Sequence, residues 1–362
     1  MIKIKYYLNI FIFMLMYSKV LANTDIDSLG NPPVKPRLML IMDNSDSMSE
    51  KDRYGDIKID TAKMKISDIL GKIPDGTTNV SLMAYDNCQT KVLVPPSNTN
   101  IGRVQSRAMS IYPTGKTPIA KSIREAGQIL ENNSQKTTVI LINDGQESCG
   151  GDPCAEARRL KQRSNLDLKF YTIGYSVDDK TRRQLQCIAK AGHGKYFDIE
   201  DSFSLGTAVH EIVKEEVTKS FDEDVDGVRN ERDNCSSTLE GFSVDKSGCE
   251  TSYTMPVPFK VASAAIEPEL VEPAIKQLAD YLKANKDKKV QIQGHADSSG
   301  TEEFNQTLSE QRAKFVMDQL INFGVPPKRL SSVGFGETQP LIDNRSPLGR
   351  QQNRRVKAEF LN

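Results

Sequence analysis

An apolar run at residues 37–42, Arg-Leu-Met-Leu-Ile-Met, is the feature that most constrains the fold of this chain. A strand without alternating polar residues is typical of a parallel sheet that helices cover on both faces. Helical patterns follow at 60–73, 119–130, 154–163, 181–191 and 205–218, and strand patterns at 79–85, 91–94, 137–143, 167–174 and 195–199. This alternation predicts an α/β doubly wound sheet of the Rossmann type over residues 37–215, with a site at the carboxyl ends of the strands.

Oxygen-bearing side chains stand at those strand ends. The first strand runs into Asp43-Asn-Ser45-Asp-Ser47, the strand at 137–143 runs into Asp144, and Thr117 lies in the sequence Gly-Lys-Thr-Pro. Two carboxylates and three hydroxyls form a set of hard oxygen ligands suited to Mg²⁺. So few anionic ligands leave a bound ion electrophilic enough to accept a carboxylate from a partner.

This part of the sequence resembles the von Willebrand factor A domain and its metal-ion-dependent adhesion site. All five positions of that site are present: Asp43, Ser45, Ser47, Thr117 and Asp144. The resemblance implies a Mg²⁺-dependent domain that binds a protein partner through the partner's carboxylate. The family contains non-enzymatic adhesion and assembly modules, so binding is expected rather than catalysis. The alternative is a domain whose site no longer binds metal.

The N-terminus predicts export. Lysines precede a mostly apolar run at residues 6–17, and Val-Leu-Ala ends at residue 22. This is the pattern of a secretory signal peptide over 1–22, followed by a linker over 23–36. The apolar run is shorter than the roughly 20 residues of a membrane span. We therefore expect an exported protein without a membrane span.

Export favours disulfides among the six cysteines. Cys235 and Cys249 are close in sequence and far from the others, which predicts a local bridge. The remaining four resemble those of a bacterial subset of the A domain. In that fold, Cys154 and Cys187 would lie on two neighbouring helices and could form one bridge. Cys88 and Cys149 would then form a second, long-range bridge. The preferred pairs are Cys154–Cys187 and Cys88–Cys149, and Cys149–Cys154 is the competing pair.

An acidic connector over residues 216–250 follows. Asp222, Asp224 and Asp226 alternate before a glycine, and Asn230 and Asp233 come next. Such spacing can wrap oxygen atoms around Ca²⁺. The loop nearly fits an EF-hand, but an aspartate stands where the final bidentate glutamate belongs. With its two cysteines the segment instead resembles a thrombospondin type 3 repeat, which implies Ca²⁺ binding. The alternative is a solvated acidic linker closed by the disulfide.

The remaining residues, 251–362, predict a small α+β sandwich. Strands are expected at 255–261, 289–294, 330–335 and 355–360, and helices at 267–284 and 308–323. This order places helices on one face of a mixed sheet.

Opposite charges at one rim of this domain indicate a binding site. The strand at 289–294 leads to Asp297, and the next helix carries Arg312. Order and spacing resemble the OmpA-like peptidoglycan-binding domain. The resemblance implies that Asp297 binds the ammonium and Arg312 the carboxylate of diaminopimelate in a wall peptide. Asn305 and Arg354 occupy the family's other polar positions, whereas Ala296 replaces a usual threonine. The alternative is a plain surface ion pair between the two charged residues.

Composition narrows the function further. Lys+Arg and Asp+Glu both number 48, so the chain lacks the excess of basic residues that is typical of nucleic-acid-binding proteins. The chain has no nucleophile elbow, P-loop or zinc spacing, so an enzyme is not expected. We expect a periplasmic protein of a Gram-negative bacterium, associated with the cell wall and outer membrane. The alternatives are a surface adhesin for host or matrix proteins, and a structural wall-spacing protein with a silent metal site.

Overall fold

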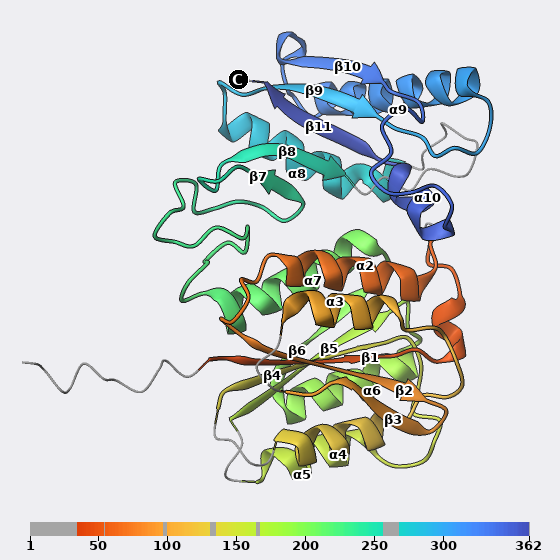
Figure 1. The fold of residues 1–362 in the computed structure, drawn as a ribbon, viewed down its shortest axis with the longest axis vertical. Coiled ribbons are helices and arrows are strands. Elements are labelled where there is room, and N and C mark those ends of the chain that lie inside the picture. Colours follow the sequence, from red (N-terminus) through yellow and green to blue (C-terminus); the bar gives the residue numbers. More distant parts are fainter. Residues whose placement is uncertain are drawn as a thin grey trace, which may run out of the picture. The chain divides into compact units, whose positions relative to one another are not determined.

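The computed structural model describes residues 35–361, except 54, 97–99, 131–134, 164–166 and 256–267. The predicted signal peptide and nearly all of the linker at 23–36 therefore lie outside the described residues. Two sheets are present in the described part of the chain, and each belongs to its own domain (Figure 1).

The N-terminal domain contains a six-stranded sheet in the order β3-β2-β1-β4-β5-β6. All neighbouring pairs are parallel except β2 and β3, which form an antiparallel edge. The strands are β1 (Arg37–Met42), β2 (Asn79–Asp86), β3 (Gln89–Val94), β4 (Thr137–Asn143), β5 (Leu168–Tyr175) and β6 (His193–Ile199). Every residue of β1 and β4 is buried, as the apolar runs predict. The doubly wound α/β fold is confirmed.

Helices cover both faces of this sheet (Figure 1). One face packs against α2 (Lys58–Gly71), α3 (Ile101–Met109) and α7 (Ser202–Val213), and the other against α4 (Ile119–Leu130), α5 (Pro153–Lys161) and α6 (Asp179–Ala191). Each set forms a separate apolar core, because side chains of a strand alternate between the two faces. Helix α3 was not predicted. Helix α7 continues into a short π-helical segment, Lys214–Thr218.

Three disulfides cross-link the chain. Cys88–Cys149 joins the turn after β2 to the loop after β4, and Cys154–Cys187 joins α5 to α6. Cys235–Cys249 closes a local loop in the connector. The structure thus has the long-range pairing preferred from sequence, and the competing Cys149–Cys154 bridge is not formed.

The C-terminal domain contains a five-stranded sheet in the order β10-β9-β11-β8-β7. Its strands are β7 (Phe242–Val244), β8 (Glu250–Met255), β9 (Lys289–Gly294), β10 (Leu330–Gly334) and β11 (Val356–Leu361). Only β9 and β10 pair in parallel. Helices α8 (Pro268–Ala284) and α9 (Glu302–Asn322) contact each other and enclose one apolar core with the sheet. The predicted α+β fold is confirmed.

Several boundaries in this domain differ from the sequence prediction. Helix α9 begins at Glu302 rather than at residue 308, because the Thr301 side chain caps it by accepting from the Phe304 amide. Strand β8 starts at Glu250 and ends at Met255, and the rest of the strand expected at 255–261 lies outside the described residues. A short helix, α10 (Pro347–Asn353), and strand β7 were not predicted. None of the helices described is both long and apolar enough to cross a bilayer.

Candidate functional sites

The predicted Mg²⁺ residues lie at the carboxyl ends of two hydrogen-bonded neighbours in the first sheet. Asp43 follows β1 and Asp144 follows β4, where the strand order reverses direction. Asp43 is fully buried and Asp144 is 8% exposed. Asn143 Nδ2 donates to Asp43 Oδ2 at 2.7 Å, and the Ser45 amide donates to Asp43 Oδ1 at 2.7 Å. These two bonds fix the orientation of the Asp43 carboxylate.

Three hydroxyl groups complete this set. The Oγ atoms of Ser45 and Ser47 are 3.0 Å apart, and the Ser47 hydroxyl donates to Asp144 Oδ1 at 2.6 Å. A methyl group on Gly145 would lie 3.4 Å from Thr117 Oγ1 and 3.6 Å from Ser47 Oγ, so both hydroxyls face one small space. The structure therefore brings all five predicted residues together. Their chemistry, hard oxygen only, fits Mg²⁺.

Burial controls the protonation of the two carboxylates. Burial, with the nearby charge of Asp144, raises the pKa of Asp43 to about 7 despite its hydrogen bonds with Ser45. Burial also raises the pKa of Asp144, although hydrogen bonds from Ser47 and Lys58 act in the opposite direction. A carboxylate that is costly to ionise in this environment favours a cation beside it.

Lys58 is a site residue that the sequence analysis missed. It is the first residue of α2 and is 5% exposed. Its Nζ lies 3.0 Å from Asp144 Oδ2 and 3.3 Å from Glu50 Oε2. No local sequence motif predicts this contact, because 86 residues separate Lys58 from Asp144 in the sequence.

The acidic residues of the connector form a second cluster. Carboxylate oxygens of Asp222, Asp224 and Asp226 all lie within 4.8 Å of one another. These residues are 0%, 1% and 9% exposed. Burial, helped by the charges of the neighbouring carboxylates and opposed by backbone hydrogen bonds, raises the pKa of Asp222 and of Asp226 to about 6. Such crowding of buried acids is stable only with protons or a cation.

Some oxygens of this cluster have no hydrogen-bond donor. Asp224 Oδ1, Asp226 Oδ2 and Asp233 Oδ2 are buried without a hydrogen-bond partner. Gly248 brings the last two residues together, since a methyl group there would lie 2.0 Å from Asp233 Oδ1 and 3.1 Å from Asp226 Oδ2. Asn230 is placed differently, because its Oδ1 accepts from the Glu223 amide at 2.7 Å. Buried carboxylate oxygens of this kind fit Ca²⁺.

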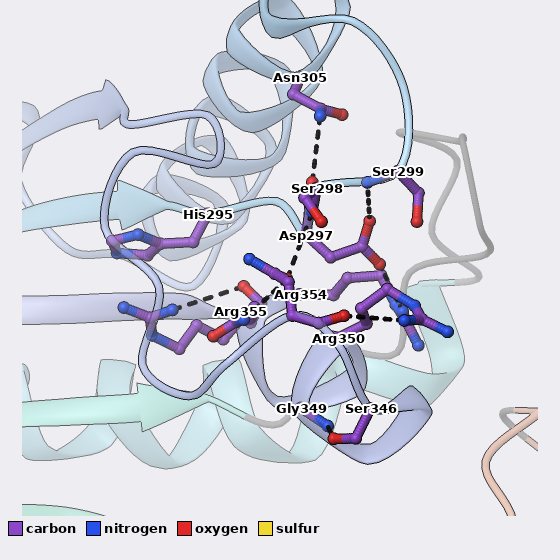
Figure 2. A network of polar contacts seen from close by, with 12 residues as sticks. His295, Asp297, Ser298, Ser299, Asn305, Ser346, Gly349, Arg350, Arg354 and Arg355 are labelled. Carbon is purple, nitrogen blue, oxygen red and sulfur yellow. Dashed lines mark hydrogen bonds and ion pairs between the residues drawn. The ribbon is translucent and has the colours of Figure 1, made fainter.

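In the C-terminal domain, Asp297 lies in the loop between β9 and α9 and is 5% exposed (Figure 2). Its Oδ2 pairs with Arg354 Nη1 at 2.6 Å, and its Oδ1 accepts from the Ser299 amide at 2.8 Å. Burial acts to raise the pKa of Asp297, but the hydrogen bonds from Arg354 and Ser299 hold it below its usual value. Asp297 is therefore an ionised, buried carboxylate.

Arg312 lies inside this domain and is 1% exposed. It projects from α9, and its Nη1 donates to the His295 carbonyl at 3.4 Å. Burial, followed by the charge of Arg354, lowers the pKa of Arg312 to about 9, and the charge of Asp297 partly opposes this shift. The predicted pair of Asp297 and Arg312 thus includes Arg354 as a third charge.

Asn305 positions the Asp297 loop. Its Nδ2 donates to the Asp297 carbonyl at 3.0 Å and to Glu337 Oε2 at 2.5 Å, and Figure 2 shows it directed toward the loop from α9. Glu337 was not predicted, and it lies in the segment after β10. Ala296 is 3% exposed and its amide donates to the Gly336 carbonyl at 2.8 Å, so a methyl-sized side chain fills this position.

Comparison with known proteins places these domains. Residues 38–146 match the von Willebrand factor type A domain, and residues 259–354 match the OmpA family. Outer membrane porin F of Pseudomonas aeruginosa is 39% identical over 144 residues, which is 38% of this chain and 41% of the porin. The chain therefore spans less than half the length of that relative.

Two further relatives match different shares of the chain. The uncharacterized protein YwmD of Bacillus subtilis is 32% identical over 172 residues, which is 43% of this chain and 75% of YwmD. The peptidoglycan-binding protein ArfA of Mycobacterium tuberculosis is 40% identical over 102 residues, which is 28% of this chain and 31% of ArfA. The chain therefore carries a von Willebrand factor type A domain followed by a domain of the OmpA family.

Proposed function

We propose that the protein is a non-catalytic envelope protein that binds peptidoglycan through its C-terminal domain and presents its A domain to a protein partner. The observation that supports peptidoglycan binding is the charged group formed by the buried Asp297 and Arg312 with the partly exposed Arg354. The relationship to ArfA, whose name states peptidoglycan binding, supports it. The relationship to porin F supports a location in a Gram-negative envelope, and we place the protein in the periplasm.

The chemistry of this group suits one end of diaminopimelate, which keeps an ammonium and a carboxylate on a single carbon. Asp297 would accept the ammonium. Arg312 would bind the carboxylate, because a planar guanidinium can donate two parallel hydrogen bonds. One carboxylate stands beside two arginines, so Arg354 can remain with Asp297 while Arg312 receives the ligand's negative charge.

In the A domain, Asp43, Ser45, Ser47, Thr117 and Asp144 would hold Mg²⁺. The bound ion would supply a position for a carboxylate of the partner protein. In the connector, Asp222, Asp224, Asp226, Asn230 and Asp233 would bind Ca²⁺, with Asn230 also holding the loop through the Glu223 amide. The buried Asp224, Asp226 and Asp233 oxygens without a hydrogen-bond donor are the reason for this second proposal.

Binding to purified cell-wall sacculi tests the anchor. Wild-type protein should sediment with sacculi that contain diaminopimelate and should be released by the free amino acid. Asp297→Asn and Arg312→Lys should lose at least roughly tenfold in affinity. The first removes the negative charge that binds the ammonium, and the second removes the two parallel guanidinium hydrogen bonds to the carboxylate. Arg345→Ala is the matched control, since that side chain is 91% exposed. Retention of both site variants at wild-type levels would exclude the proposed anchor.

Partner capture tests the A domain. A partner should be retained from an envelope extract in Mg²⁺, and lost both with chelator and with Asp43→Ala. Equal capture under all three conditions would exclude metal-dependent binding. Protease digestion of intact cells separates a periplasmic protein from the alternative of a surface adhesin, because only the latter is cleaved.

A further inference from the structure

Lys58 places a fixed positive charge beside the proposed Mg²⁺ residues. The lysine is 5% exposed, and its ammonium lies 3.0 Å from Asp144 Oδ2. Both oxygens of Asp144 are therefore engaged, Oδ1 by the Ser47 hydroxyl and Oδ2 by Lys58. The second partner of the ammonium, Glu50, is 68% exposed, so solvent screens that contact. Asp144 is the buried partner of this lysine.

The backbone around Lys58 holds it in this position. Its amide donates to the Glu50 carbonyl at 3.0 Å, and Lys51 and Ile57 form an antiparallel bridge. These contacts hold Lys58, the first residue of α2, next to the proposed metal-site residues. A cation at a helix N-terminus is unfavourable against the helix dipole, and burial adds a desolvation cost. Asp144 supplies the compensating interaction.

We propose that Lys58 is a built-in counterion of the metal site, which stabilises Asp144 without metal and lowers the site's affinity for divalent cations. The inference rests on the Mg²⁺ site proposed above. When both carboxylates are ionised to hold the metal, Asp43 and Asp144 carry a charge of minus two, and the Lys58 ammonium reduces the total to minus one. A divalent ion then leaves the loaded site at plus one. Without the ammonium, the loaded site would be neutral.

This charge balance gives Lys58 a role in partner binding. A loaded site with a net positive charge attracts a partner's carboxylate, whereas a neutral one does so less. Lys58 therefore lowers the affinity of the site for Mg²⁺ and raises the attraction of the loaded site for a carboxylate of the partner. A lysine that served only to pack the start of α2 would not change metal affinity in this direction.

Metal titration of the full-length protein tests the proposal. Mg²⁺ binding is measured by calorimetry in the presence of enough Ca²⁺ to fill the proposed connector site. The heat signal that Asp43→Asn abolishes is assigned to the A domain. Lys58→Met should bind Mg²⁺ roughly tenfold more tightly or better, because a nearby buried positive charge is removed. Lys58→Arg should stay near wild type. Lys116→Met removes an exposed lysine next to Thr117 and should change affinity by less than about threefold.

The metal-free fold provides a second measurement in case Lys58→Met is too unstable to titrate. In chelator, Lys58→Met should unfold roughly 10 °C below wild type, because the buried Asp144 loses its ion-pair partner. Lys58→Met/Asp144→Asn should regain most of that loss. Failure of the double variant to recover would overturn the counterion role.

The outcomes separate the two proposals. If wild type and Lys58→Met bind Mg²⁺ equally, or the variant binds more weakly, the counterion inference is wrong and the Mg²⁺ site stands. An equal gain in Lys58→Met and Lys116→Met would also overturn it, since a general charge effect would explain both. If Lys58→Met binds Mg²⁺ and wild type does not, the inference holds in its strongest form, because Lys58 then neutralises Asp144 in place of a metal ion. If neither binds, both proposals fail.

Discussion

The burial of Asp43 makes a sharp prediction about stability and pH in the absence of metal. Its folded-state pKa is about 7, whereas the ordinary value is 3.8. A carboxyl group with a raised folded-state pKa stabilises the fold while protonated, and this contribution is lost as pH rises from about 4 toward 7. Between pH 5 and pH 7 the loss is about 2 kcal/mol at 1.36 kcal/mol per unit, because the slope falls as the group ionises near its own pKa. For a domain of this size that is roughly 4–8 °C in melting temperature.

Thermal denaturation followed by circular dichroism measures this effect. The purified protein is melted at pH 5, 6, 7 and 8 in chelator and in Mg²⁺. The melting temperature of the A domain should fall with pH in chelator. Mg²⁺ should reduce the fall, because it binds the ionised carboxylate.

Asp43→Asn isolates the contribution of Asp43. Burial also raises the pKa values of Asp144, Asp222 and Asp226. The pH dependence of the melting temperature is therefore compared between wild type and Asp43→Asn. Asp68→Asn, at an exposed position on α2, is the control and should keep the wild-type slope. If Asp43→Asn keeps the full pH dependence, burial of Asp43 is not its source and the argument is refuted.

Two further predictions concern the C-terminal domain and the connector. Gly294→Ala should lower the free energy of unfolding by about 1–3 kcal/mol, because the added methyl would lie 2.0 Å from the Ser309 carbonyl oxygen; an unchanged urea midpoint would contradict it. Replacing Cys235 and Cys249 by serine should cost about 3 kcal/mol through the freed loop and should weaken Ca²⁺ binding, since the bridge holds the segments that carry Asp233 and Gly248; equal Ca²⁺ titrations would contradict this.

The fold was largely predictable, because parallel strands that are buried on both faces consist of uninterrupted apolar residues, which are easily recognised in a sequence. Helix α3 was missed although its buried residues Ile101, Val104 and Ala108 have helical spacing, because a helix of nine residues has too few turns to establish the period. Helix α10 has no apolar face at all. It is organised by Asn353, whose side chain accepts from two backbone amides and donates to the Ile342 carbonyl.

The candidate sites were predictable where one motif or one strand end holds the residue, as at Asp43 and Asp297. Lys58 and Glu337 were not, because their contacts depend on how distant segments meet in three dimensions. Asn230 stays a predicted Ca²⁺ ligand. Its Oδ1 accepts from the Glu223 amide, a contact within the loop that its spacing alone does not predict. Spacing shows which residues can converge, and competition among local hydrogen bonds decides which of them do.

The depth of Arg312 has a consequence for how attachment would respond to the surroundings. Exposed charges are screened over about 8 Å at physiological salt, whereas buried charges are screened far less. The Arg345–Asp343 pair, with side chains 91% and 52% exposed, belongs to the first kind. Arg312 and Asp297 belong to the second. An anchor built on them would hold through swings of ionic strength that detach proteins bound by surface charge, and only a ligand that enters the domain could release it.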